Sequence, residues 1–194
     1  MDILGILNGR VDLFLLILAR VSGMFQMAPV FASQRVPPVV RAALAAVISL
    51  ILVISQPASP IPVTNLWYLA LGMAGEFLLG FAMGYVVNLV MAATQTAGQL
   101  IDMQMGFGIV NVLDPQSGQQ IPLMGNFQYL LALMVLLGMN GHHLIINAIA
   151  GSYELVPLFG FKVDAAMAGF MVSMFCGMFV SGLTIALPLV AALF

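Results

Sequence analysis

Residues 66–104 read LWYLALGMAGEFLLGFAMGYVVNLVMAATQTAGQLIDMQ and contain no proline. Because nothing in this stretch interrupts a helical backbone, it predicts a single helix from about residue 66 to residue 104. At about 1.5 Å per residue such a helix would be about 60 Å long, roughly twice the thickness of the hydrocarbon core of a bilayer. We therefore expect a helix that either breaks or extends well beyond a membrane.

The composition of the 194-residue chain is not that of a soluble domain. Hydrophobic residues make up 62% of the chain and charged residues only 6%, whereas roughly one-quarter of a soluble chain is charged. So few polar side chains cannot cover a globule in water. The chain is expected in a bilayer, in contact with membrane lipid, or buried among partners that are in one.

Charge and cysteine usage exclude several classes of partner and site. The formal net charge is −2, and the few cationic residues do not form a run, so nucleic acid is not an expected partner. Cys176 is the single cysteine and indicates neither a disulfide framework nor a cysteine metal site. Asp2 and Asp12 stand where a signal peptide would be basic, so we expect the first helix to belong to the mature protein.

Further apolar segments flank the long one and predict an all-α fold. They cover residues 11–31, 42–55, 121–139, 144–153 and about 164–194, separated by proline-rich or polar turns such as NGHH at 140–143. The expected architecture is a set of membrane-associated helical hairpins with long central helices and an irregular loop. By the positive-inside tendency, the loop that holds Arg35 and Arg41 is expected to face the cytoplasm.

Small or polar residues recur at every fourth position of the long segment. They are Gly72, Glu76, Gly80, Gly84, Asn88, Ala92 and Thr96. Small residues at this spacing let helix backbones approach closely in a membrane, and a four-residue period winds around the helix in a right-handed sense. We expect Gly72, Gly80, Gly84 and Asn88 to be helix-packing residues. Their neighbours could be helices of the same chain or, in a winding array, other subunits.

Glu76 and Arg20 are the charges most out of place in apolar helices. A carboxylate in an apolar helix is costly and is usually paired or placed in a wet cavity. Arg20 is alone in the first apolar segment, so we expect the two to be buried charges that compensate each other. An ion-transport role is the alternative, but one acid and one arginine do not make a proton relay.

No sequence pattern predicts an enzyme, a cofactor or a metal. The chain has no nucleophile elbow, phosphate-binding loop or zinc-protease motif. His142 and His143 are adjacent, so on a helix they would point about 100° apart and would not share a metal easily.

A polar, turn-rich segment, GQLIDMQMGFGIVNVLDPQSGQQIPL, lies at residues 98–123 between apolar helices. Irregular backbone at membrane depth is tolerated only where protein buries it or where it lines a watery cavity. Gly106 and Gly108 permit sharp turns around Phe107, and Asp114-Pro115 is a strong turn signal. The segment is therefore either a solvent-exposed connection or a re-entrant loop that occludes a conduit.

Several stretches together resemble the T-subunit family of the type III secretion export apparatus, whose flagellar members are the FliR proteins. They are ARVSGMFQMAPVFASQRVPPVVRAALA at 19–45, GEFLLGFAMG at 75–84, AGQLIDMQMGFGIVNVLDPQSGQQ at 97–120 and NGHHLIINAIAGSYELVP at 140–157. The resemblance covers nearly the whole chain. Each stretch alone is weak, and their combined order carries the resemblance.

The resemblance implies a function and a set of partners. FliR-like subunits join FliP-like and FliQ-like subunits in an export gate, with FlhB and FlhA alongside. Unfolded flagellar substrates cross this gate in the bacterial inner membrane, at the flagellar basal body. Residues 1–162 would form a FliP-like helical region, and residues 163–194 the start of a FliQ-like hairpin. Because family members normally continue through a further hairpin, that last part is expected to be incomplete.

The resemblance also implies that residues 106–120 act as a plug in the pore. The residues expected to fill it or to let it swing aside are Met103, Met105, Gly106, Phe107, Gly108, Ile109, Val110 and Val112. The alternative function is a small-solute channel or secondary transporter with the same loop as filter or gate, although no inverted repeat supports it. A purely structural scaffold is the third possibility.

Overall fold

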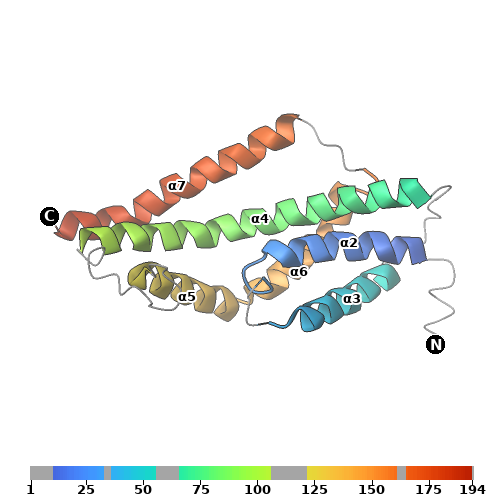
Figure 1. Cartoon of the computed structure of the whole chain (residues 1–194), viewed down its shortest axis with the longest axis horizontal. Helices are drawn as coiled ribbons and strands as arrows, with labels where there is room; N and C mark the ends of the chain where they lie inside the picture. The colour runs from blue at the N-terminus through green and yellow to red at the C-terminus, as the bar shows by residue number, and fades with distance from the viewer. Residues whose placement is uncertain (1–10, 33–35, 56–65, 106–121, 161–164, 194) are drawn as a thin grey trace, which may run out of the picture. The chain divides into compact units, whose positions relative to one another are not determined.

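The structure is a computed structural model that describes residues 11–32, 36–55, 66–105, 122–160 and 165–193. Within these ranges the chain forms helices and no strand. The helices, coloured along the chain in Figure 1, are α2 (Val11–Met27), α3 (Pro38–Ser55), α4 (Leu66–Gln104), α5 (Leu123–Gly138), α6 (Gly141–Leu155) and α7 (Ala165–Leu193). The expectation of an all-α fold is confirmed.

Helix α4 has the bounds that its lack of proline predicts. It runs unbroken from Leu66 to Gln104 and contains 39 residues. The chain divides into two compact units, one formed by Met1–Tyr85 with His142–Asp164 and the other by Val86–Gly141 with Ala165–Phe194. The first half of α4 therefore belongs to one unit and its second half to the other.

The first unit is centred on α2. Large apolar side chains of this helix, including Leu16, Ile17, Met24 and Phe25, are almost completely buried. Helix α3 packs against α2 and begins at Pro38, a residue whose fixed φ suits the first position of a helix. Burial of this apolar face makes α2 the core element of the unit, although the helix has only 17 residues.

The second unit joins the second half of α4 to α5 and α7. A Cβ atom built on Gly98 of α4 would lie 2.5 Å from Cα of Gly125 in α5. A Cβ atom built on Gly182 of α7 would lie 3.1 Å from the carbonyl oxygen of Ala93 in α4. Both crossings place backbone against backbone, so small residues set the positions of α5 and α7 on α4.

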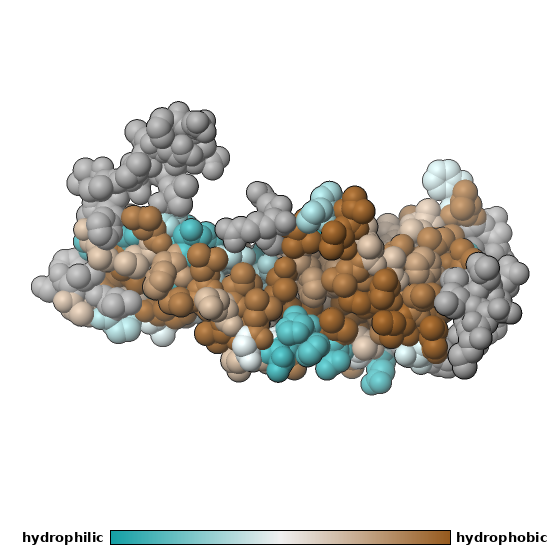
Figure 2. Space-filling view, turned by 90° about the horizontal axis from the view of Figure 1, so that it is seen from below, coloured by the Kyte–Doolittle hydropathy of each residue, from teal (hydrophilic) through white to brown (hydrophobic). Residues whose placement is uncertain are grey.

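Much of the described surface is apolar. Trp67, Leu66 and Leu155 are each more than four-fifths exposed, and apolar residues cover much of the face drawn in Figure 2. Among the residues that the structure describes, three stretches are long and apolar enough to cross a membrane: Pro38–Ser55, Leu66–Gln104 and Gly169–Ala192. The pair α5 and α6, joined at a bend, could form a fourth span. Such surfaces require lipid or protein partners.

Several helix boundaries differ from the limits of the apolar segments. Helix α2 ends at Met27, short of residue 31, and α3 begins at Pro38, before residue 42, at a proline pair that suits a helix start. The expected turn at 140–143 was too long, because His142 and His143 already lie in the first turn of α6. The turn centres on Asn140, whose φ of 57° is left-handed. Asparagine tolerates this conformation better than most residues do, and the break at Met139 and Asn140 bends α6 by 68° from α5.

Candidate functional site

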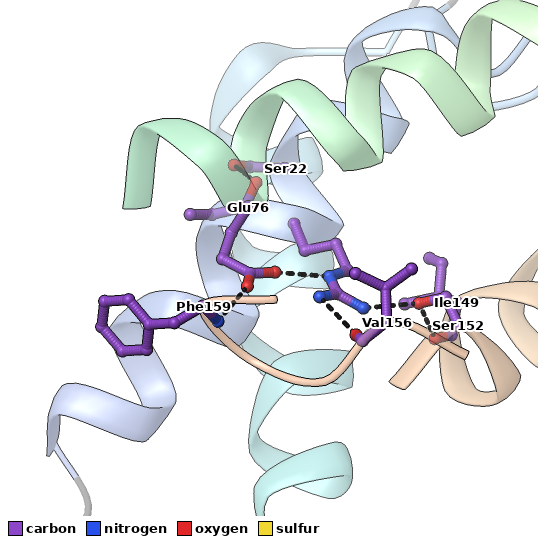
Figure 3. Close-up of polar contacts among 8 residues, drawn as sticks. Ser22, Glu76, Ile149, Ser152, Val156 and Phe159 are labelled. Atoms are coloured by element: carbon purple, nitrogen blue, oxygen red, sulfur yellow. Dashed lines mark hydrogen bonds and ion pairs between the residues drawn. The ribbon is translucent and has the colours of Figure 1, made fainter. Parts of the chain in front are cut away.

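The guanidinium of Arg20 is the centre of a buried polar network in the first unit. Arg20 lies on α2 and is 0% exposed. Its Nε donates to Oε2 of Glu76 on α4 at 2.5 Å, and its Nη1 donates to Oγ of Ser152 on α6 at 2.9 Å. Its Nη2 donates to the carbonyl oxygen of Val156 at 3.1 Å, just beyond α6. Figure 3 shows these contacts converging from three helices.

Glu76 and Tyr153 complete the surroundings of Arg20. The second carboxylate oxygen of Glu76 accepts the backbone N–H of Phe159 at 3.2 Å. The ring of Tyr153 lies 4.1 Å from the Arg20 guanidinium carbon, within range of a cation–π interaction. Glu76 is 1% exposed, so both charges of the pair are withdrawn from solvent. We name these six residues, Arg20, Glu76, Ser152, Tyr153, Val156 and Phe159, the arginine hub.

The arginine hub connects segments that lie far apart in the sequence. Taking two charges out of water is costly, and only good geometry with further hydrogen bonds offsets that cost. Here Glu76 is 56 positions from Arg20, and Ser152 is 132 positions away. Because removing either ion would leave the other uncompensated, the hub couples α2, α4 and the end of α6 strongly.

Close backbone contact between α2 and α4 brings the two charges together. A Cβ atom on Gly80 would lie 1.9 Å from the carbonyl oxygen of Arg20, and one on Gly23 would lie 2.2 Å from that of Phe77. A Cβ atom on Gly84 would lie 2.6 Å from the carbonyl oxygen of Met24. The glycines of α2 and α4 therefore allow the two backbones to contact each other directly. Glu76 lies one turn before Gly80 on α4, which places it next to Arg20.

Gly72 has a different neighbour. A Cβ atom there would lie 2.2 Å from Cε1 of Phe159, whose ring stacks on Tyr68 with centroids 4.7 Å apart. Phe159 has a φ of 62°, which is left-handed and unfavourable for a bulky residue. The stacked ring and the hydrogen bond to Glu76 hold it there, so the turn after α6 is fixed from two sides.

The structure places the remaining predicted site residues as follows. Asn88 is half-buried on α4, in the second unit. Met103, near the end of α4, is 71% exposed, and Met105 just after it is 40% exposed. Gly106, Phe107, Gly108, Ile109, Val110 and Val112 lie outside the described residues. Met103 lines an apolar groove with Leu100 of α4 and with Leu183 and Ala186 of α7.

The partners of Arg20 beyond Glu76 were missed by sequence reasoning. Ser152, Tyr153 and Val156 lie in the stretch SYELVPLF, which has no pattern that points to an arginine. One signal was present: a guanidinium carries more donors than one carboxylate can accept, so a buried arginine needs further acceptors. Among the described residues, no group of three or more His, Cys, Asp or Glu side chains could hold a metal ion.

Comparison with known proteins identifies the family of this chain. Residues 11–194 match the family described as bacterial export proteins, family 1. The chain belongs to this family. The match includes α2, α4 and α6, so all the segments that build the arginine hub lie inside the family region.

Relatives of this export-family chain are flagellar proteins. Flagellar biosynthetic protein FliR of Bacillus subtilis (strain 168) is 36% identical over 97% of this chain and 74% of its own length. FliR of Escherichia coli (strain K12) is 30% identical over 91% of this chain and 67% of its own length. FliR of Caulobacter vibrioides is 31% identical over 73% of this chain and 57% of its own length. The resemblance to the FliR family is confirmed.

Proposed function

We propose that this chain is a subunit of a flagellar type III protein export gate. In this proposal it assembles with FliP-like and FliQ-like subunits in the bacterial inner membrane at the flagellar basal body, with FlhB and FlhA alongside. Unfolded flagellar proteins would cross the conduit that the subunits form. The observation that carries the proposal is the family match over residues 11–194, with FliR relatives at up to 36% identity among those compared.

The exposed apolar surface supports assembly with partners. In α7, only 12% of the window Gly169–Ala192 is buried within the chain, and large side chains such as Phe170, Val172 and Val180 are exposed. A helix this apolar is stable only in lipid or against other helices. An export subunit that shares its surfaces with several partners meets this need.

The domain division remains part of the proposal. Residues 1–162 would be the FliP-like region, and residues 163–194 the start of a FliQ-like hairpin. Helix α7 covers most of the second part as one long apolar helix, which is compatible with one arm of a hairpin. The two compact units follow a different division, because α4 contributes to both of them.

The plug is the finer part of the proposal. Residues 106–120 would occlude the conduit, with Phe107, Ile109, Val110 and Val112 filling it. Met103 and Met105 would stand at its start, where flexible thioethers can fit an irregular gap and yield to a passing chain. Gly106 and Gly108 would absorb the backbone rotation that a moving segment needs. The exposure of Met103 and Met105 within the subunit leaves both side chains available to such a role.

Isolation of the intact complex tests the assignment. The tagged chain would be extracted with mild detergent from a flagellated bacterium that carries it in place of its own FliR, and the complex weighed by native mass spectrometry. The proposal expects FliP-like and FliQ-like subunits in fixed ratio. A chain isolated by itself that binds or carries a small solute would support the transporter alternative instead.

A further inference from the structure

Helix α5 begins without a cap of its own. The first N–H groups of any helix lack partners within it, and a Ser, Thr, Asp or Asn before the helix usually supplies one. Here Pro122 occupies that position and makes no side-chain cap hydrogen bond. The first backbone bond of the helix runs from the N–H of Asn126 to the carbonyl oxygen of Pro122, at 3.0 Å. The N–H groups before Asn126 therefore need another acceptor.

Asp102, twenty residues before Pro122 and on a different helix, supplies that acceptor. The N–H of Met124 donates to Oδ1 and Oδ2 of Asp102 at 3.1 and 3.0 Å, and the N–H of Gly125 donates to Oδ2 at 3.2 Å. Asp102 lies in the last turn of α4 and is 5% exposed. A carboxylate at a helix N-terminus also interacts favourably with the helix dipole. Asp102 thus caps α5 from α4.

The neighbouring glycines make this contact possible. Gly98 precedes Asp102 by one turn, so both lie on the same face of α4. A Cβ atom on Gly98 would lie 2.5 Å from Cα of Gly125, and one on Gly125 would lie 3.1 Å from the carbonyl oxygen of Gln95. Because neither glycine carries a side chain, the backbone of α5 approaches α4 closely enough for the carboxylate to reach two amides.

We propose that Asp102 is a positioning residue of the export subunit, which fixes the start of α5 to the end of α4. The chain leaves α4 near Met105 and enters α5 at Pro122, so the Asp102 contact, with the Gly98–Gly125 approach, fixes where Met105 and Pro122 lie relative to each other. The functional part of this inference rests on the proposed export function. The competing interpretation is an ordinary helix cap, whose loss weakens the first turn of α5 and changes nothing else.

Amide hydrogen exchange of the purified, full-length chain in its complex tests the contact. In Asp102→Ala, peptides that begin at α5 are expected to exchange about tenfold faster in the first turn of the helix, because no side-chain acceptor remains there. Helix α2 should be unchanged. Glu154→Ala, which removes an exposed carboxylate from α6, is the matched control and should leave α5 as in the wild type. Unchanged exchange in Asp102→Ala would overturn the contact.

A second substitution separates positioning from capping. Pro122→Asp places a local cap on α5 and, in the Asp102→Ala background, is expected to restore slow exchange in the first turn. Export of flagellar protein, measured in the culture medium, should stay reduced in the double variant, because the new cap does not bind α4. Pro122→Asp alone should export normally. Full recovery of export in the double variant would show that Asp102 is only a cap.

A further substitution covers the case in which Asp102→Ala does not assemble. Gly98→Ala keeps Asp102, but its added methyl group would lie 2.5 Å from the backbone of Gly125, so α5 must move away and export should also fall. Normal export by Gly98→Ala, with faster exchange at α5, would overturn the positioning role. If the wild-type chain is found without FliP-like and FliQ-like subunits, the proposed function fails. The exchange measurement then still decides whether Asp102 holds α5.

Discussion

Gly80 of α4 lies directly against the backbone of Arg20 in α2. A Cβ atom at Gly80 would come within 1.9 Å of the Arg20 carbonyl oxygen, a distance that no relaxed structure allows. The same crossing aligns Arg20 with Glu76, one turn away on α4. Helix packing and charge pairing are therefore one feature of this fold, and substitutions at either should affect both.

Gly80→Ala should separate α2 from α4 and break the arginine hub. The added methyl group meets rigid backbone rather than a flexible side chain, so the helices must move apart. We expect a large loss in the yield of assembled complex, measured after detergent extraction, and a larger loss for Gly80→Leu combined with Gly84→Leu. Gly151→Ala is the matched control, because a Cβ atom there meets nothing within 4 Å. Equal yields from Gly80→Ala and Gly151→Ala would contradict the prediction.

Glu76→Gln should destabilise the first unit strongly. The substitution keeps the shape of the side chain but leaves the guanidinium of Arg20 buried without a counter-charge, which typically costs about 3–5 kcal/mol. The measurement is the thermal unfolding midpoint of the detergent-solubilised complex. Glu154→Gln removes an exposed acid from α6 and should have almost no effect.

Replacement of both charges should be milder than removal of one. In Arg20→Met combined with Glu76→Leu, no ion remains buried, and apolar side chains of similar size can fill much of the space. We expect this double variant to unfold at a higher temperature than Glu76→Gln alone. A double variant that is less stable than the single one would show that the hydrogen bonds to Ser152 and Val156 matter more than the charge.

Phe159 offers a test of the turn after α6. Its left-handed backbone favours glycine, whereas its ring stacks on Tyr68 and covers Gly72. Phe159→Ala loses the ring and keeps the unfavourable φ, while Phe159→Gly loses the ring but relieves the backbone by roughly 1 kcal/mol. Both should lower the unfolding midpoint, and the alanine variant should be the less stable one. The reverse order would mean that the turn changes conformation when the ring is removed.

Deletion of residues 106–112 tests the proposed plug. If these residues occlude the conduit, the deletion should leave the complex assembled and make cells permeable to ions and small dyes. Conductance and dye uptake would be compared with the wild type at equal complex yield. If the segment were only a solvent-exposed connection, its deletion would not open a conduit. Wild-type permeability of cells that contain the intact complex would therefore rule out the plug.

Some features of the subunit could be predicted from local sequence. Helix α4 was predicted from 66 to 104 because helical hydrogen bonds are local, and no proline interrupts them over that stretch. The small residues at every fourth position marked Gly80 and Gly84 as close contacts, since their spacing depends only on helix geometry. Arg20 and Glu76 were recognisable as a pair because few other charges exist in the apolar helices.

Tertiary structure alone decided which faces meet. Ser152 and Phe159 join Arg20 and Glu76 across 132 and 83 positions, and no local pattern encodes such a distance. Sequence reasoning placed Asp102 both in the expected helix 66–104 and in the polar segment 98–123, but it did not predict that Asp102 caps α5. That contact arises because Gly98 and Gly125 let the two backbones approach. Local sequence therefore determined where helices form and which residues are small or charged. The contacts depend on how the helices pack, since a buried polar group must pair with one of the few partners that the packing brings within hydrogen-bond distance.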